Sequence, residues 1–140
     1  MGKYYKGVYT PRNKEKYIGK GVCNYRSGWE HTMMRYLDEN PKIAKWCSEC
    51  LIIPYMFEGK QHKYFTDFYV QTVQGKNILI EVKPLRETKP PRKTKRKKKS
   101  TLLYEQYTYA KNIAKWTAAR DYCKRRKIEF KIITEKNLNL

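Results

Sequence analysis

The stretch from Asp67 to Lys83 reads DFYVQTVQGKNILIEVK. It holds two runs of aromatic and branched residues on either side of a turn around Gln74-Gly75, and such runs predict two antiparallel strands, His62 to Gln71 and Lys76 to Lys83. A hairpin loop centred on Gln74 sets Asp67 directly opposite Glu81. Opposed side chains of an antiparallel pair lie about 4.5 to 5.5 Å apart at Cβ, where like charges are destabilising. A positive group is therefore expected between the two carboxylates.

The other elements are predicted from helical and alternating periodicity. They are helices from Ser27 to Asn40 and from Leu103 to about Arg126, and strands from Glu49 to Phe57 and from Ile128 to Thr134. The order of helix, three strands, helix and strand predicts an α/β domain in which helices pack against a mixed sheet. We expect this single domain at residues 25–140, with a flexible basic loop at 86–101. Residues 1–24 are predicted to form an irregular basic arm, rich in Tyr and Lys, that suits DNA contact or docking on its own domain equally well.

The charge of the chain indicates its partner. Its 140 residues include 32 Lys and Arg against 13 Asp and Glu, a net charge of +19. Such a charge on one domain favours a polyanion, and no apolar run reaches the roughly 18 to 20 residues of a membrane span. We therefore expect nucleic acid and no membrane. The predicted DNA-binding residues are those of the basic run: Lys89, Arg92, Lys93, Lys95, Arg96, Lys97, Lys98 and Lys99.

The opposed carboxylates suggest a hydrolytic site. Mg²⁺ is typically held by one or two carboxylates while it also contacts water and phosphate oxygens. Lys83 follows Glu81 on the same face of the strand, where it is placed to orient a metal-bound water or to stabilise charge on a phosphate. The alternative is a salt bridge among Asp67, Glu81 and Lys83 on the solvent face of the hairpin.

Glu30 is the candidate third carboxylate. Ser27-x-x-Glu30 forms a capping box, which by itself explains the glutamate. Glu30 also shares a helix sector with Met34 and Leu37, which we expect to face the sheet, so it is also a candidate metal ligand.

These residues resemble the PD-(D/E)xK nuclease pattern, whose restriction-endonuclease-like core has the predicted order of elements. Further segments resemble the head completion nucleases of tailed bacteriophages, over roughly residues 4–138. They include Tyr25-Arg26-Ser27, Ile53-Pro54-Tyr55, Ala114-Lys115-Trp116 and the run from Phe130 to Glu135. The chain departs from the pattern at Thr66, where the family name has Pro.

The resemblance implies a metal-dependent DNA endonuclease. Glu30, Asp67, Glu81 and the Val82 carbonyl would hold Mg²⁺ (or Mn²⁺), and Lys83 would be catalytic. It also implies action on double-stranded DNA during phage head completion after packaging, beside portal or head proteins, in the host cytoplasm or the virion head. The main alternative is a non-catalytic, basic DNA-binding head-assembly protein. A third, an RNA-binding accessory protein, needs exposed aromatics where the charged trio is expected.

The four cysteines predict no zinc site. Cys47 and Cys50 have the spacing of half a zinc site, but Cys23 and Cys123 lie far away in the sequence and no second close pair exists. We expect free, partly buried thiols. Glu49, between the first two, is expected to be structural.

Overall fold

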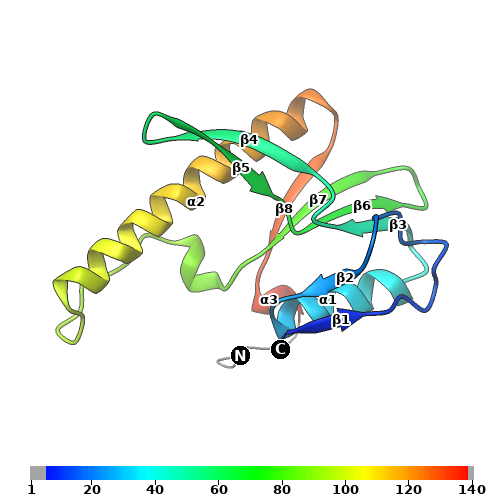
Figure 1. The fold of residues 1–140 in the computed structure, drawn as a ribbon, viewed down its shortest axis with the longest axis horizontal. Coiled ribbons are helices and arrows are strands. Elements are labelled where there is room, and N and C mark those ends of the chain that lie inside the picture. Colours follow the sequence, from blue (N-terminus) through cyan, green and yellow to red (C-terminus); the bar gives the residue numbers. More distant parts are fainter. Residues whose placement is uncertain (1–5, 139–140) are drawn as a thin grey trace.

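The computed structural model describes residues 6–138. Its elements in chain order are β1 (Gly7–Tyr9), β2 (Cys23–Tyr25), α1 (Gly28–Glu39), β3 (Ile43–Ser48), β4 (Ile52–Phe57), β5 (Lys60–Phe65), β6 (Phe68–Thr72), β7 (Asn77–Val82), the 3-10 turn η1 (Leu85–Thr88), α2 (Lys99–Arg125), β8 (Glu129–Ile133) and α3 (Glu135–Leu138) (Figure 1). Over residues 6–138, no helix combines the length and apolar character that a bilayer-spanning helix needs.

A four-stranded mixed sheet in the order β3-β6-β7-β8 forms the centre of the molecule. The pairs β3–β6 and β6–β7 are antiparallel, whereas β7 and β8 are parallel and are connected through α2. A parallel pair needs such a crossover, because its second strand must start again at the same end of the sheet. The predicted mixed sheet with packed helices is confirmed.

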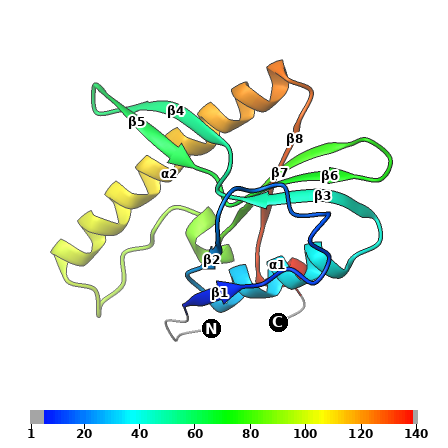
Figure 2. The same ribbon diagram turned by 45° about the vertical axis from the view of Figure 1, so that its right-hand side comes forward.

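Other elements of the chain cover both faces of this sheet. α1, α3 and the β1–β2 ribbon lie on one face, and α2 with the β4–β5 hairpin lies on the other (Figures 1 and 2). The two buried clusters follow the alternation of β7: Ile78, Ile80 and Val82 pack with α1, whereas Leu79 packs with α2. Because Glu81 is on the same face of β7 as Leu79, it is directed toward α2.

The predicted strand boundaries need two corrections. The strand expected at Glu49–Phe57 is β4 alone and starts at Ile52, while β3 precedes it in a segment for which no element was predicted. The strand expected at His62–Gln71 is divided into β5 and β6. Both breaks have one cause. The chain from β3 to β6 forms one long hairpin, which leaves the central sheet after β3 and before β6 and continues as the separate β4–β5 pair that packs on α2.

The second helix starts earlier than predicted, at Lys99 rather than Leu103. The expected loop at 86–101 also loses its first residues to η1, so the irregular basic segment is 89–98. Lys97, just before α2, forms an ion pair of 2.8 Å with Glu105, which lies in the second turn of the helix. Only Lys99 of the basic run joins the helix, and Lys98 is its N-cap.

The N-terminal arm is ordered against the domain, contrary to the irregular arm expected at residues 1–24. β1 and β2 pair, and the carboxylate of the fully buried Asp38 accepts hydrogen bonds from the Tyr9 hydroxyl (2.6 Å) and from the amides of Arg12 (2.7 Å) and Asn13 (3.1 Å). The docking interpretation therefore holds from residue 7 onward. Residues 1–5 lie outside the described residues.

Candidate active site

Asp67 lies where the long hairpin bends between β5 and β6. On one strand three residues, 49–51, connect the paired segments, whereas on the other strand only two, 66–67, do so. The extra residue makes a β-bulge, and Glu49 takes the positive φ of 53° that such bulges use. The Glu49 amide donates to the Asp67 carbonyl at 3.0 Å, which holds Asp67 at the bend. An ion pair of 2.9 Å with Arg26 supports the structural interpretation of Glu49.

The register of β6 and β7 brings the two predicted carboxylates together. Phe68 pairs with Ile80 and Val70 with Ile78, as the hairpin centred on Gln74 predicts. Extending this register by one residue sets Asp67 opposite Glu81. The Asp67 carboxylate accepts a hydrogen bond of 2.7 Å from the Val82 amide, so it lies across the end of β7.

Glu81 is buried beneath α2. It is 4% exposed, and its Oε2 atom accepts a hydrogen bond of 3.1 Å from Nε1 of Trp116. Within residues 6–138, no ion pair joins Lys83 to Asp67 or Glu81. The interpretation of these three residues as a surface salt bridge is therefore wrong, because α2 covers that face of the hairpin.

The two carboxylates of the site, Asp67 and Glu81, interact electrostatically. Burial, the charge of Glu81 and a hydrogen bond to Glu81 raise the pKa of Asp67 well above its ordinary value, although the Val82 amide opposes the shift. The neighbouring Tyr64 hydroxyl has its pKa raised by burial and by the same two carboxylates. A cation at this position would relieve the repulsion between the carboxylates.

Lys115 is a site residue that the sequence analysis missed. It is half-buried on α2, with its Nζ atom 5.6 Å from the centre of the Tyr64 ring. Burial and then the charge of Lys83 lower its pKa, while Glu81 and Asp67 act in the opposite direction. Two lysines from different elements therefore flank the carboxylate pair. The available signal was a single lysine within the apolar run from Ala114 to Ala119.

Ser27 and Glu30 form one half of the predicted capping box, and the Glu30 carboxylate contacts the Ser27 hydroxyl rather than the Ser27 amide. Ser27 is the N-cap of α1, and its hydroxyl accepts from the Glu30 amide (3.1 Å) and lies 3.3 Å from the Glu30 carboxylate. Burial raises the pKa of Glu30 despite the hydrogen bond from Ser27, and the negative charge of Glu30 adds to the upward shift of Asp67. Among the described residues, no three His, Cys, Asp or Glu side chains form a group that could hold a metal. Metal binding by Glu30 stays a prediction.

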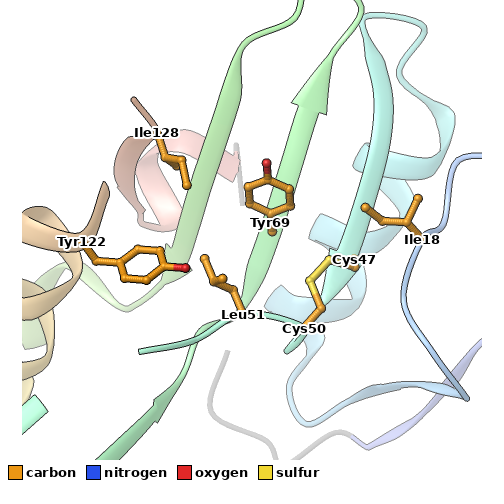
Figure 3. A pocket seen from close by; sticks show the side chains of 7 residues that line it. All are labelled: Ile18, Cys47, Cys50, Leu51, Tyr69, Tyr122 and Ile128. Atoms are coloured by element: carbon orange, nitrogen blue, oxygen red, sulfur yellow. A yellow bond between two sulfur atoms is a disulfide. The ribbon is translucent and has the colours of Figure 1, made fainter. Parts of the chain in front are cut away.

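The expectation that all four cysteines are free thiols is wrong. Cys47 and Cys50 form a disulfide across the bulge rather than being free thiols, whereas Cys23 and Cys123 are free and buried (Figure 3). An apolar pocket adjoins the disulfide, and none of the acidic site residues lines it. Its lining residues are Ile18, Cys47, Cys50, Leu51, Tyr69, Tyr122 and Ile128 (Figure 3).

The predicted DNA-binding residues lie between η1 and the start of α2. Lys97 is the half-buried member of the set, and its Nζ atom donates to the Arg92 carbonyl (2.5 Å) and pairs with Glu105. It therefore holds the loop against the helix. The other seven are exposed: Lys89, Arg92, Lys93, Lys95, Arg96, Lys98 and Lys99.

Two comparisons with known proteins bear on this site. Residues 40–135 match the family of TnsA-like endonuclease N-terminal domains. That range contains Asp67, Glu81, Lys83 and Lys115 and begins after Glu30. The chain is also 40% identical over 140 residues to the head completion nuclease of Enterobacteria phage T4, in a match that covers 96% of this chain and 93% of the relative.

Proposed function

Because the chain belongs to the family of TnsA-like endonuclease N-terminal domains, we propose that it is a Mg²⁺- or Mn²⁺-dependent endonuclease that hydrolyses phosphodiester bonds of double-stranded DNA. The observation that carries this proposal is the pair of opposed carboxylates, Asp67 and Glu81, at one end of β7 with Lys83 and Lys115 beside them. Repelling carboxylates are costly in a fold unless a bound cation compensates them.

The donor set suits a hard divalent cation. Asp67 and Glu81 supply carboxylate oxygens, which Mg²⁺ prefers. The Val82 amide points at Asp67, and in an extended strand the amide and carbonyl of one residue point to the same neighbour, so the Val82 carbonyl would be a third oxygen donor. Glu30 would contribute from the start of α1. The bound ion supplies a Lewis acid and lowers the pKa of its water.

The two lysines have separate proposed roles. Lys83 would orient the attacking water or take its proton, since it follows Glu81 and Val82 at the end of the same strand. Lys115 would bind a non-bridging oxygen of the phosphate and stabilise the negative charge that develops there.

We propose that this activity serves the completion of a phage head after DNA packaging, in contact with portal or head proteins. The support is the name of the T4 relative, together with the extent of the match. The net charge of +19 is consistent with DNA as the substrate, because phosphate contacts supply most sequence-independent affinity.

Supercoiled plasmid provides the test. We expect nicking by the wild type with Mg²⁺ or Mn²⁺, no nicking in EDTA, and none by Asp67→Ala purified in parallel, which controls for contaminating nuclease. Plasmid binding without nicking by the wild type in either metal would contradict the nuclease. That result would support the basic head-assembly protein that grips DNA without cutting it.

A further inference from the structure

Trp116 makes a side-chain contact that the proposed chemistry does not itself require. It lies in the middle of α2 and is 2% exposed, and its indole Nε1 donates to Oε2 of Glu81 at 3.1 Å. Glu81 lies 35 residues earlier, on β7, and is itself 4% exposed. The hydrogen bond is therefore a buried link between the helix and the carboxylate of the site.

A carboxylate on a strand is not oriented by its backbone alone. The terminal torsion of glutamate is broad, so the plane of the carboxylate rotates unless a neighbour restrains it. An indole has a single donor and no acceptor, so it restrains one oxygen without competing for a cation. Hydrogen bonds to an ionised acceptor are also stronger than neutral ones. The same carboxylate is also hydrogen-bonded to Asp67, so the bond from Trp116 restrains the carboxylate that faces the other acid of the site.

We propose that Trp116 is a positioning residue that orients Glu81 for binding of the divalent cation. This inference rests on the proposed function, because it assigns the cation to the same pair of carboxylates. Hydrogen-bond partners of metal ligands typically change metal affinity by about 10- to 100-fold when they are removed. Trp116→Phe removes the donor and keeps a buried aromatic ring.

Trp46 provides the matched control. It is also fully buried, but its Nε1 has no hydrogen-bond partner among the described residues, and it packs in the core on the α1 side of the sheet. Trp46→Phe therefore makes the same chemical change without removing a hydrogen bond. Any loss that comes only from the smaller ring should be seen in both variants.

The experiment is a calorimetric titration of full-length wild type, Trp116→Phe and Trp46→Phe with Mn²⁺ in the absence of DNA, with melting curves in EDTA to show that each variant folds. We expect Mn²⁺ to bind Trp116→Phe about 10- to 100-fold more weakly than wild type, and Trp46→Phe to match wild type. Equal affinities of wild type and Trp116→Phe would overturn the role of Trp116 and leave the nuclease intact. A wild type that binds no Mn²⁺ would overturn the metal site and this inference together.

A second measurement needs no folded Trp116→Phe. The indole N–H signals of the wild type in a nitrogen-15 NMR spectrum can be assigned by elimination with Trp46→Phe and Trp29→Phe. We expect the Trp116 signal to shift on addition of Mg²⁺, over the same range of Mg²⁺ concentration that raises the melting temperature. The Trp46 signal should stay in place. A Trp116 signal that does not respond at saturating Mg²⁺ would overturn the proposal.

Discussion

The Asp67 carboxylate accepts a hydrogen bond of 2.7 Å from the amide of Val82, the residue between Glu81 and Lys83. This bond joins the bend of one strand to the end of the next and holds the two carboxylates of the site in register. The fold keeps them close although burial and the charge of Glu81 both raise the cost of ionising Asp67. The balance of charge at this point is therefore the property that the first two predictions test.

Neutralising Asp67 should leave the metal-free protein at least as stable as the wild type. Asp67→Asn keeps an oxygen that can accept from Val82 and removes the repulsion with Glu81, which gives a gain of up to about 1 kcal/mol. Mg²⁺ should raise the melting temperature of the wild type and much less that of the variant. Melting curves in EDTA and in millimolar Mg²⁺ decide this. A wild type indifferent to metal beside a destabilised variant would contradict the metal site.

The same pair predicts a pH dependence. The pKa of Asp67 is raised in the folded state, so between its ordinary value near 4 and the raised value the folded chain binds more protons than the unfolded chain. The contribution of Asp67 to stability in EDTA should therefore fall as pH rises above about 4, and Asp67→Asn should lack this decline. The measurement is the difference in melting temperature between variant and wild type, which should widen with pH. A difference that is constant from pH 4 to 8 would be evidence against the shift.

The two lysines should affect cleavage and not DNA binding. Lys83→Ala is expected to abolish metal-dependent nicking, and Lys115→Met to slow it roughly 100-fold, as loss of one charge-stabilising donor typically does. Lys124→Met, in the exposed last turn of the same helix, should cleave normally and serves as the control. Single-turnover rates and filter-binding affinities separate the two effects. Wild-type rates in Lys115→Met would remove Lys115 from the site.

The basic segment at 89–98 and the first residue of α2 should determine the salt dependence of DNA binding. Replacing the seven exposed Lys and Arg residues of the predicted DNA-binding set by Gln, with Lys97 kept to hold the loop, should flatten the slope of log affinity on log salt by about 0.9 for each phosphate that is no longer neutralised. Exposed Lys60, Lys63 and Lys76, replaced in the same way, form the control. An unchanged slope would indicate that the segment contacts a protein instead of DNA.

Asp38 should be the main anchor of the N-terminal arm. Burial opposes its charge, but the hydrogen bonds from Tyr9 and from the amides of Arg12 and Asn13 outweigh burial and lower its pKa. Asp38→Asn would turn an amide group toward these donors, at a cost of about 2 to 3 kcal/mol. Asp121, which is exposed and paired with Arg125 at 3.1 Å, provides the control. Asp121→Asn should lower the free energy of unfolding by at most about 1 kcal/mol.

The pH dependence of that loss has a defined sign. Because the folded pKa of Asp38 is depressed, its contribution is complete above the ordinary Asp value and disappears as pH falls through the folded value. Urea unfolding at pH 7 and at pH 3 should show the difference between wild type and Asp38→Asn shrinking at low pH. An equal difference at both would show that shape, not charge, holds the arm.

The sequence by itself determined the central hairpin and its chemistry. Alternation in β7 and the turn at Gln74-Gly75 specify which residues oppose each other, because the side-chain period of a strand is two and a one-residue register slip would exchange the residues of the two faces. The Asp67 and Glu81 pair, and Lys83 after it, followed from that local pattern. Ser27 and Asn40-Pro41 determined the ends of α1 in the same local way.

Only the tertiary structure decided what surrounds that hairpin. The bulge at Glu49, the Cys47–Cys50 disulfide and the contacts of Lys115 and Trp116 depend on the packing of α2 and the β4–β5 hairpin over the sheet. Sequence periodicity identifies the inward side of a helix but not which strand lies beneath each residue. The contact of Trp116 with Glu81 spans 35 positions, so it arises from the crossover between β7 and β8 and not from local propensity.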